Sequence, residues 1–329
     1  RVAVTQGHDR YETMPAPYLT DTKVNTYLWH NEWQLGIHQV TAALERREDR
    51  LTNASTTPTD TQRNQNALAL GYGVKLGAHT VQLSLRRDDD SEVGVRTTGN
   101  VGYAFALTPQ WRLTASTGTA FRAPTLFQRY SMYGLPTLKP EESNNRELGM
   151  KYANQSTTFS TVAYHNRVTN LISYVSGPGS CANGVGMYAG CYGNTGKATY
   201  SGVTLAAGTR ISRVGLNASL DLQDPKDDVT GKRLARRAKR VLKLGADTQV
   251  AGWGLAGDVL LSGDRYNNAT NTQLLPGYGV LNLSATKPLT RNLSLLVRLD
   301  NVADKDYQTV TGYATAGRTA FVGLKWSGL

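Results

Sequence analysis

Residues 293–326 read LSLLVRLDNVADKDYQTVTGYATAGRTAFVGLKW, and this stretch decides the fold. Apolar residues occupy the odd positions over 293–299, whereas Arg298 and Asp300 lie on the even positions. Alternation with a period of two predicts a strand with one apolar and one polar face. A polar loop with glycines follows over 304–317, and the alternation then resumes up to the last tryptophan. An amphipathic final strand with a late aromatic residue is typical of a bacterial outer-membrane β-barrel.

The rest of the chain repeats this pattern, and no segment of comparable length shows the 3.6-residue period of a helix. We therefore predict an all-β, antiparallel, up-and-down transmembrane β-barrel with about 16 strands in this chain. The expected strands are 2–11, 23–33, 37–49, 66–76, 79–88, 95–107, 111–120, 145–153, 157–174, 198–211, 214–222, 239–250, 253–265, 278–287, 293–302 and 318–326. Composition does not change along the chain, so we expect a single domain over 1–329.

The connections between these strands are alternately long and short. The short ones are 34–36, 77–78, 108–110, 154–156, 212–213, 251–252 and 288–292. The long ones are 12–22, 50–65, 89–94, 121–144, 175–197, 223–238, 266–277 and 303–317. Strict alternation puts every long loop at one end of the sheet, as in outer-membrane barrels with short periplasmic turns and long outer loops.

Side chains agree with a membrane barrel. Trp33, Trp111, Trp253 and Trp326 all lie at the short-turn end, where an aromatic girdle belongs. The opposite face carries charges that a packed core does not bury at low cost, and a wet lumen or a polar plug accommodates them. These inward residues are Arg86, Arg112, Asn217, Asp221, Lys243, Asp247, Asp258, Arg298 and Asp300.

Composition and charge exclude only a few classes of protein. The net charge is +11, which suits nucleic acid or an anionic membrane surface. No run of 18 apolar residues exists, so a transmembrane helix is excluded, while barrel strands remain possible because each is short and half polar. We find no motif of an enzyme or a phosphate loop, and the five histidines show no metal-ligand spacing. We therefore expect no catalytic activity, no cofactor and no metal.

Two cysteines, Cys181 and Cys191, lie in one glycine-rich loop. A pair of cysteines without a nearby histidine makes a poor zinc site, because closed zinc sites need four ligands. A disulfide that closes this loop in an oxidising compartment is the expected state, with two free thiols as the alternative.

Four short motifs carry a resemblance to a known family. Residues 121–126 (FRAPTL) precede 138–143 (LKPEES), and 299–307 (LDNVADKDY) precede Gly317 and Arg318. In this order and spacing the motifs resemble the barrel of TonB-dependent outer-membrane receptors over the whole chain. The RLARRAK stretch and the sequence over 304–318 look most similar to the cobalamin (vitamin B12) branch of that family.

The resemblance implies a mechanism and a departure from it. In the family, an N-terminal plug fills the barrel, substrate binds the outer loops and plug, and the TonB complex of the inner membrane pulls on the plug. This sequence shows no plug and only sixteen expected strands, whereas such transporters have about 22. We therefore expect a C-terminal receptor portion in the outer membrane of a Gram-negative bacterium, which would meet TonB only through a plug. Siderophore receptors and a passive porin-like or structural barrel are the alternatives.

By resemblance, Arg236 is the foremost candidate contact for cobalamin or another large chelate. The alternative is a basic rim that meets lipopolysaccharide phosphates (Arg236, Arg237, Lys239 and Arg240) in the outer-membrane lipid. A nucleic-acid partner is disfavoured, because the cluster lies on neither a helix nor an aromatic-stacking sheet. Four loop residues are further candidates, with a generic polar loop as the alternative: Tyr266, Asn267, Tyr130 and Tyr133. The run Asp88–Asp90 suggests calcium, but we expect a solvated charge run.

Overall fold

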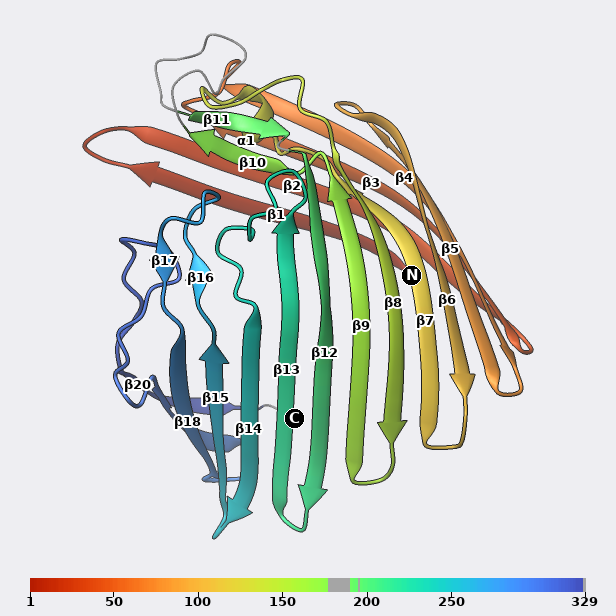
Figure 1. Cartoon of the computed structure of the whole chain (residues 1–329), viewed down its shortest axis with the longest axis vertical. Coiled ribbons are helices and arrows are strands. Elements are labelled where there is room, and N and C mark those ends of the chain that lie inside the picture. Colours follow the sequence, from red (N-terminus) through yellow and green to blue (C-terminus); the bar gives the residue numbers. More distant parts are fainter. Residues whose placement is uncertain (177–189, 195, 328–329) are drawn as a thin grey trace. The chain divides into compact units, whose positions relative to one another are not determined.

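A computed structural model describes residues 1–176, 190–194 and 196–327. Within these residues, sixteen strands form one antiparallel sheet in which strands follow the order of the chain (Figure 1). They are β1 (Val2–Thr13), β2 (Tyr18–Leu35), β3 (His38–Asn53), β4 (Asp60–Leu76), β5 (His79–Asp90), β6 (Gly94–Ala106), β7 (Trp111–Arg122), β8 (Glu141–Ala153), β9 (Thr157–Thr169), β12 (Lys197–Ile211), β13 (Val214–Asp227), β14 (Arg240–Val250), β15 (Trp253–Ser262), β18 (Tyr278–Pro288), β19 (Leu293–Asp300) and β20 (Thr319–Trp326). The predicted all-β class and the sixteen strands are confirmed.

Three smaller elements were not predicted. The helix α1 (Leu126–Tyr130) lies in the loop after β7, and two hairpins pair β10 (Ile172–Ser176) with β11 (Gly190–Asn194) and β16 (Arg265–Tyr266) with β17 (Leu274–Leu275). In the described part of the chain, no helix is long and apolar enough to cross a membrane.

The chain divides into two compact units. Unit 1 comprises Arg1–Phe105, Ala115–Arg146 and Asn166–Ala198. Unit 2 comprises Ala106–Thr114, Glu147–His165 and Thr199–Leu329. Each unit is described by itself below.

The register in unit 2 separates an apolar face from a polar one. One cross-strand row consists of Leu216, Ala246, Gly257, Leu283, Leu299 and Ala320. The row one residue along each strand consists of Asn217, Gly245, Asp258 and Asn282. Successive residues of a strand point to opposite faces, so the two rows lie on opposite faces of the sheet, as the alternation predicts. On the polar face, the Asn282 amide donates to the Asp258 carboxylate at 2.8 Å.

Unit 1 repeats this division. Trp29, Leu44 and Leu68 form one cross-strand row, and Glu45, Ala67 and Asp88 form a row on the opposite face. The side chains of the apolar row remain exposed, with Leu44 at 52%. An exposed apolar face on one side of a sheet is typical of strands that face lipid.

The tryptophans lie at the ends that the sequence predicts. Trp33 pairs with Val40 and Trp253 pairs with Val250, each beside a short turn. The turn after Val250 consists of Ala251 and Gly252, which both have positive φ angles of 49° and 76°. Two successive positive φ angles characterise the type I′ turn, whose twist matches that of the strands it joins.

The predicted strand boundaries are wrong mainly at the strand ends that lead into long loops. β2 begins at Tyr18 rather than residue 23, and β4 begins at Asp60 rather than residue 66. Both extensions are mostly polar and show no regular alternation, so the sequence pattern does not mark them. The expected strand 157–174 ends at Thr169, because the chain turns at Asn170 with a φ of 55° and continues into the β10–β11 hairpin.

Candidate functional site

In unit 2, the long loop before β14 is fastened to the β16–β17 hairpin by one asparagine. The Asn271 amide oxygen accepts from the Arg233 backbone N–H at 2.9 Å, and its amide nitrogen donates to the Arg233 carbonyl at 2.9 Å. The Arg233 guanidinium donates to Asp264 at 2.9 Å and lies 5.2 Å from the centre of the Tyr266 ring. The Asn271 side chain thus bonds both the N–H and the C=O of Arg233, as a neighbouring strand would. These two bonds fix the loop that carries Arg236.

Arg236 is held by its backbone while its side chain stays open. Its N–H donates to the Tyr266 carbonyl at 2.6 Å, and its φ is 60°. The guanidinium is exposed and makes no hydrogen bond or ion pair with the residues that the structure describes. A non-glycine residue with a positive φ is uncommon and is kept only where its surroundings fix it. The fold therefore presents an arginine whose five donors are available to a ligand.

The other residues of the expected basic rim differ in whether their charges are paired. Arg237 is exposed like Arg236, and Arg240 begins β14. Lys239, however, forms an ion pair with Asp224 at 2.7 Å. Lys239 is thus engaged within the protein, and the open cations next to Arg236 are fewer than the sequence indicates.

Tyr266 and Asn267, both predicted from the sequence, are brought beside Arg236 by the hairpin. Asn267 donates through its amide to Gln273 at 2.9 Å and accepts from the Thr311 N–H at 3.2 Å. Asn267 therefore connects two long loops. The Tyr266 ring is partly covered by Arg233, which leaves it half-buried.

Sequence reasoning missed an aromatic contact in unit 2. The rings of Tyr278 and Tyr307 stack with their centres 4.1 Å apart, and the guanidinium of Arg265 lies 5.2 Å from the Tyr278 ring. Arg265 is buried, with 9% of its surface exposed. Tyr307 ends the family motif over 299–307, which draws attention to this residue, but nothing in the sequence pairs it with Tyr278.

Tyr130, a predicted contact residue in unit 1, is held by hydrogen bonding within the protein. Its hydroxyl donates to the Glu92 carboxylate, which also receives Arg129 at 3.3 Å. Burial of the ring, and then the negative charge of Glu92, raise the pKa of the Tyr130 hydroxyl. α1 itself is fixed by a capping box between Thr125 and Gln128.

Tyr133 joins an aromatic cluster that the sequence did not reveal. Its carbonyl accepts from the Tyr192 N–H at 2.8 Å, and its ring lies 6.0 Å from the Tyr174 ring. Tyr174 and Tyr192 meet edge to face at 5.5 Å, and Phe127 of α1 lies 6.3 Å from Tyr192. The β10–β11 hairpin thus rests beside α1 (Figure 1). Edge-to-face aromatic pairs add stability beyond the area that they bury.

The predicted disulfide falls on Cys181, which lies outside the described residues. Cys191 lies on β11, opposite Val175 of β10. The bond between the two cysteines stays a prediction.

The expectation of a solvated charge run at Asp88–Asp90 is wrong for two of its members. Asp88 and Asp90 are 1% and 2% exposed. Asp88 accepts from Arg86 at 2.9 Å and from Gln65 at 2.7 Å. Buried carboxylates persist where cations and donors surround them, and alternation had already placed both on the polar face. No group of acidic, histidine or cysteine side chains in the described residues is arranged to hold a metal ion.

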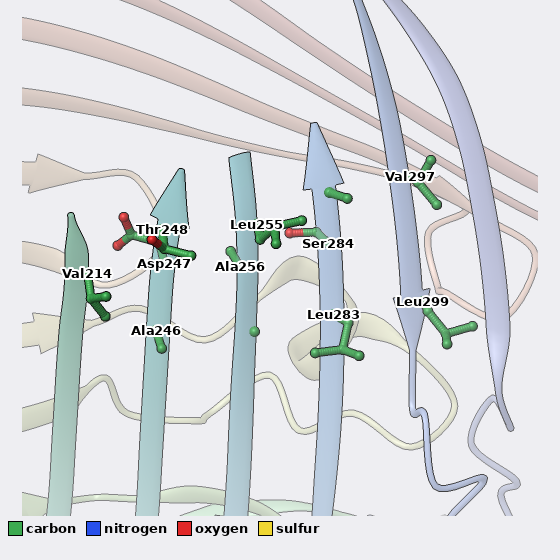
Figure 2. A pocket seen from close by; sticks show the side chains of 12 residues that line it. Val214, Ala246, Asp247, Thr248, Leu255, Ala256, Leu283, Ser284, Val297 and Leu299 are labelled. Atoms are coloured by element: carbon green, nitrogen blue, oxygen red, sulfur yellow. The ribbon is translucent and has the colours of Figure 1, made fainter. Parts of the chain in front are cut away.

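An apolar hollow of unit 2 lies on the apolar face of the sheet and not beside the candidate loop residues. The hollow has a volume of about 480 Å³ and lies over β13–β19. Figure 2 shows Val214, Leu255, Leu283 and Val297 among its lining side chains. These residues belong to the exposed apolar face of unit 2, and the hollow arises where Ala246 and Gly257 leave room between larger neighbours. A trough on such a face suits lipid chains rather than an amide-rich ligand.

Comparisons with known proteins agree with this architecture. The family model "TonB dependent receptor-like, beta-barrel" matches residues 4–302. The chain is 29% identical over 296 residues to the vitamin B12 transporter BtuB of Photobacterium profundum, a match that covers 89% of this chain and 48% of that protein. The chain therefore spans about half the length of this curated relative.

Solved structures share the fold, including the following two. The ferric enterobactin receptor PfeA of Pseudomonas aeruginosa superposes with a TM-score of 0.79 at 19% identity, over 98% of this chain and 58% of that one. The siderophore receptor PirA of Acinetobacter baumannii superposes with a TM-score of 0.75 at 18% identity, over 94% and 55%. Proteins of this family are receptors and transporters of the Gram-negative outer membrane. With a family match over most of its length, this chain belongs to the TonB-dependent receptor β-barrel family.

Proposed function

We propose that this chain is the single barrel domain of an outer-membrane receptor that takes up cobalamin with energy from the TonB complex. The observation that carries the proposal is the cobalamin-type sequence over 233–239 and 304–318, together with 29% identity to a vitamin B12 transporter over most of the chain. TonB would act through a plug, as in the family, and lipopolysaccharide would surround the barrel.

The loop residues offer the chemistry that cobalamin needs. Cobalamin is large, amphipathic and rich in amides, so its recognition requires hydrogen-bond donors beside aromatic surfaces. Arg236 presents an open guanidinium, with Tyr266 and Asn267 next to it. A guanidinium donates to amide carbonyls and to phosphate and keeps its charge at any relevant pH. In unit 1, Tyr130 and Tyr133 act mainly by fixing the loop, and Tyr174 supplies an exposed ring beside them.

The test is calorimetry of cyanocobalamin binding to the receptor expressed from its complete gene. Loss of one charge-assisted contact costs roughly 1.5–3 kcal/mol, so Arg236→Ala should weaken binding about ten- to a hundredfold. Arg237→Ala removes a neighbouring exposed charge and is the matched control, with little expected change. If Arg236→Ala and Arg237→Ala both bind like the wild type, Arg236 is only a rim charge.

A siderophore receptor is the second candidate, favoured by the likeness to PfeA and PirA. At 18–19% identity that likeness concerns the fold alone. The same calorimeter distinguishes the two candidates when ferric enterobactin replaces cyanocobalamin. Binding of the iron chelate without binding of cyanocobalamin would replace the cobalamin proposal with the siderophore one.

A further inference from the structure

Two like charges face each other on unit 1. Lys23 of β2 and Arg50 of β3 are direct cross-strand neighbours. Both side chains are exposed, and neither makes a hydrogen bond or an ion pair with the described part of the chain. Like charges directly opposite each other destabilise a sheet. The Asp21 carboxylate, two residues from Lys23, also feels the Lys23 charge but is bonded to His8. A further anion between Lys23 and Arg50 would relieve their repulsion.

The space around the pair is hollow and lined by polar groups. A pocket of about 600 Å³ lies there, bordered by Lys23, Arg50, Arg10 and Gln62. The two carboxylates in the same pocket are already engaged. Asp21 is 3.1 Å from a ring nitrogen of His8, and Asp60 accepts from the Thr52 hydroxyl at 2.5 Å. Arg10 is paired with Glu12 at 3.1 Å. Lys23 and Arg50 are therefore the open groups of the pocket.

The pair lies on the apolar face of the sheet, beyond the end of the apolar band. On β2, Trp29 and Trp33 have the same parity as Lys23 and therefore point to the same face. Ten residues separate Trp33 from Lys23, which is about 34 Å along a strand and about 26 Å along the membrane normal at a tilt of about 40°. An outer-membrane barrel has an apolar band about 25 Å tall. With Trp33 at the short-turn interface, Lys23 and Arg50 reach the opposite, outer interface.

We infer that Lys23 and Arg50 bind a phosphate of the lipid A part of lipopolysaccharide. The inference rests on the proposed outer-membrane location. Arg50 offers a planar fork of donors and Lys23 a compact charge, which together suit a phosphate monoester. Lipid A carries phosphates at the membrane interface directly above acyl chains, and this site likewise lies directly above an apolar surface. A phosphate between the two cations removes their repulsion, so the lipid and the sheet stabilise each other.

The test measures lipid binding to the complete receptor in detergent by native mass spectrometry. Bisphosphorylated lipid A, dephosphorylated lipid A and inorganic phosphate are the three probes. Lys23→Gln and Arg50→Gln should each weaken binding of bisphosphorylated lipid A about tenfold, the loss expected for one charge-assisted contact. Arg291→Gln is the control, because Arg291 is exposed in a short turn of unit 2. Dephosphorylated lipid A should bind weakly and equally to all four proteins.

Several results would overturn the inference. Equal binding of bisphosphorylated lipid A by wild type and both variants removes the site. Binding of inorganic phosphate that depends on Lys23 and Arg50, without binding of lipid A, shows a free-anion site instead. In lipid-free detergent, Lys23→Gln should melt no lower than the wild type, because it removes a repulsion; a lower melting temperature contradicts the inference. Cyanocobalamin binding on the same samples separates the two proposals, since its absence leaves the lipid result unaffected.

Discussion

The polar faces of the two units look alike in sequence but differ in how their charges are held. In unit 1, Arg63 lies between Asp49 and Asp90, and the side chains of Arg63 and Asp90 are 13% and 0% exposed. In unit 2, the pair of Arg210 and Asp247 is 55% and 53% exposed. The same alternation of apolar and polar residues thus produces a buried ionic network in one unit and open surface pairs in the other.

The contacts of Arg63 explain the difference, because two carboxylates and a carbonyl converge on its guanidinium. Arg63 donates to Asp49 through two nitrogens, lies 3.6 Å from Asp90, and donates to the Pro124 carbonyl at 2.8 Å. Pro124 directly precedes Thr125, the N-cap of the helix α1, so the network fastens the long loop of unit 1 to the sheet. Unit 2 fastens its long loop by the neutral amide of Asn271, beside the more exposed ion pairs of Arg233 with Asp264 and Lys239 with Asp224. The ion pairs that hold the loop of unit 1 are therefore more deeply buried than those of unit 2.

The largest expected effect is on Arg63. Removing one partner of a buried ion pair leaves an uncompensated charge and costs about 3–5 kcal/mol. We expect Arg63→Ala to lower the unfolding free energy by that amount in a urea titration of the receptor in lipid vesicles. Arg210→Ala, in the exposed pair of unit 2, should cost about 0–1 kcal/mol. Equal losses for the two variants would refute the contrast between the units.

A buried amide in unit 1, Asn53, should matter more than the partly buried loop amide of unit 2, Asn271. Asn53 is fully buried, donates to Tyr18 and Thr20, and accepts from the backbone and hydroxyl of Ser55. Asn53→Ala leaves these groups unsatisfied and should cost about 1–3 kcal/mol of global stability. A urea titration measures this loss, and an unchanged unfolding free energy would contradict the role of Asn53.

Asn271→Gly is the counterpart in unit 2, because glycine tolerates its φ of 57° and only the side chain is lost. Hydrogen exchange should show faster exchange at Arg233 with little change in global stability. Fast exchange spread over β13–β15 would contradict a local role.

The loop over 175–197 belongs to unit 1 and tests whether this unit also uses a covalent bond. A disulfide between Cys181 and Cys191 would restrict the unfolded loop by about 2–3 kcal/mol in the chain-entropy model. Mass spectrometry after alkylation without reduction should find both cysteines unmodified. Alkylation of both cysteines would exclude the disulfide.

The smallest effect concerns Tyr130. Burial and Glu92 raise the pKa of its hydroxyl above the ordinary value of 10.0. The unfolded chain then loses this proton at lower pH than the folded chain, so the folded state loses stability as pH rises above about 10. Melting temperatures of Tyr130→Phe should fall less steeply than those of the wild type above about pH 10. Parallel curves would show that Tyr130 does not contribute.

Sequence reasoning succeeded wherever the alternation was complete. It located sixteen strands, and it placed Trp33 and Trp253 beside short turns. It failed where local composition carries no period. α1 contains only five residues, and the extension of β2 to Tyr18 is mostly polar and has no regular alternation.

The candidate site was predicted less completely, for a physical reason. The sequence named Arg236 and Tyr266, which the fold brings together through one backbone hydrogen bond. It did not reveal that Asn271 fixes their loop, because a side chain that replaces a strand partner has no sequence signature. It also read Asp88 and Asp90 as solvated, since the burial of Asp90 depends on Arg63 of β4 and that of Asp88 on the folded positions of Arg86 and Gln65.

Uptake of labelled cyanocobalamin tests the central claim most directly. The complete gene would be expressed in a Gram-negative strain without its own cobalamin receptor, and uptake would be measured before and after a protonophore removes the energy for TonB. A cobalamin receptor of this family should accumulate the label, lose that accumulation after the protonophore, and show weaker uptake with Arg236→Ala. Uptake that persists without energy would indicate a passive pore, and no uptake at all would contradict the cobalamin assignment.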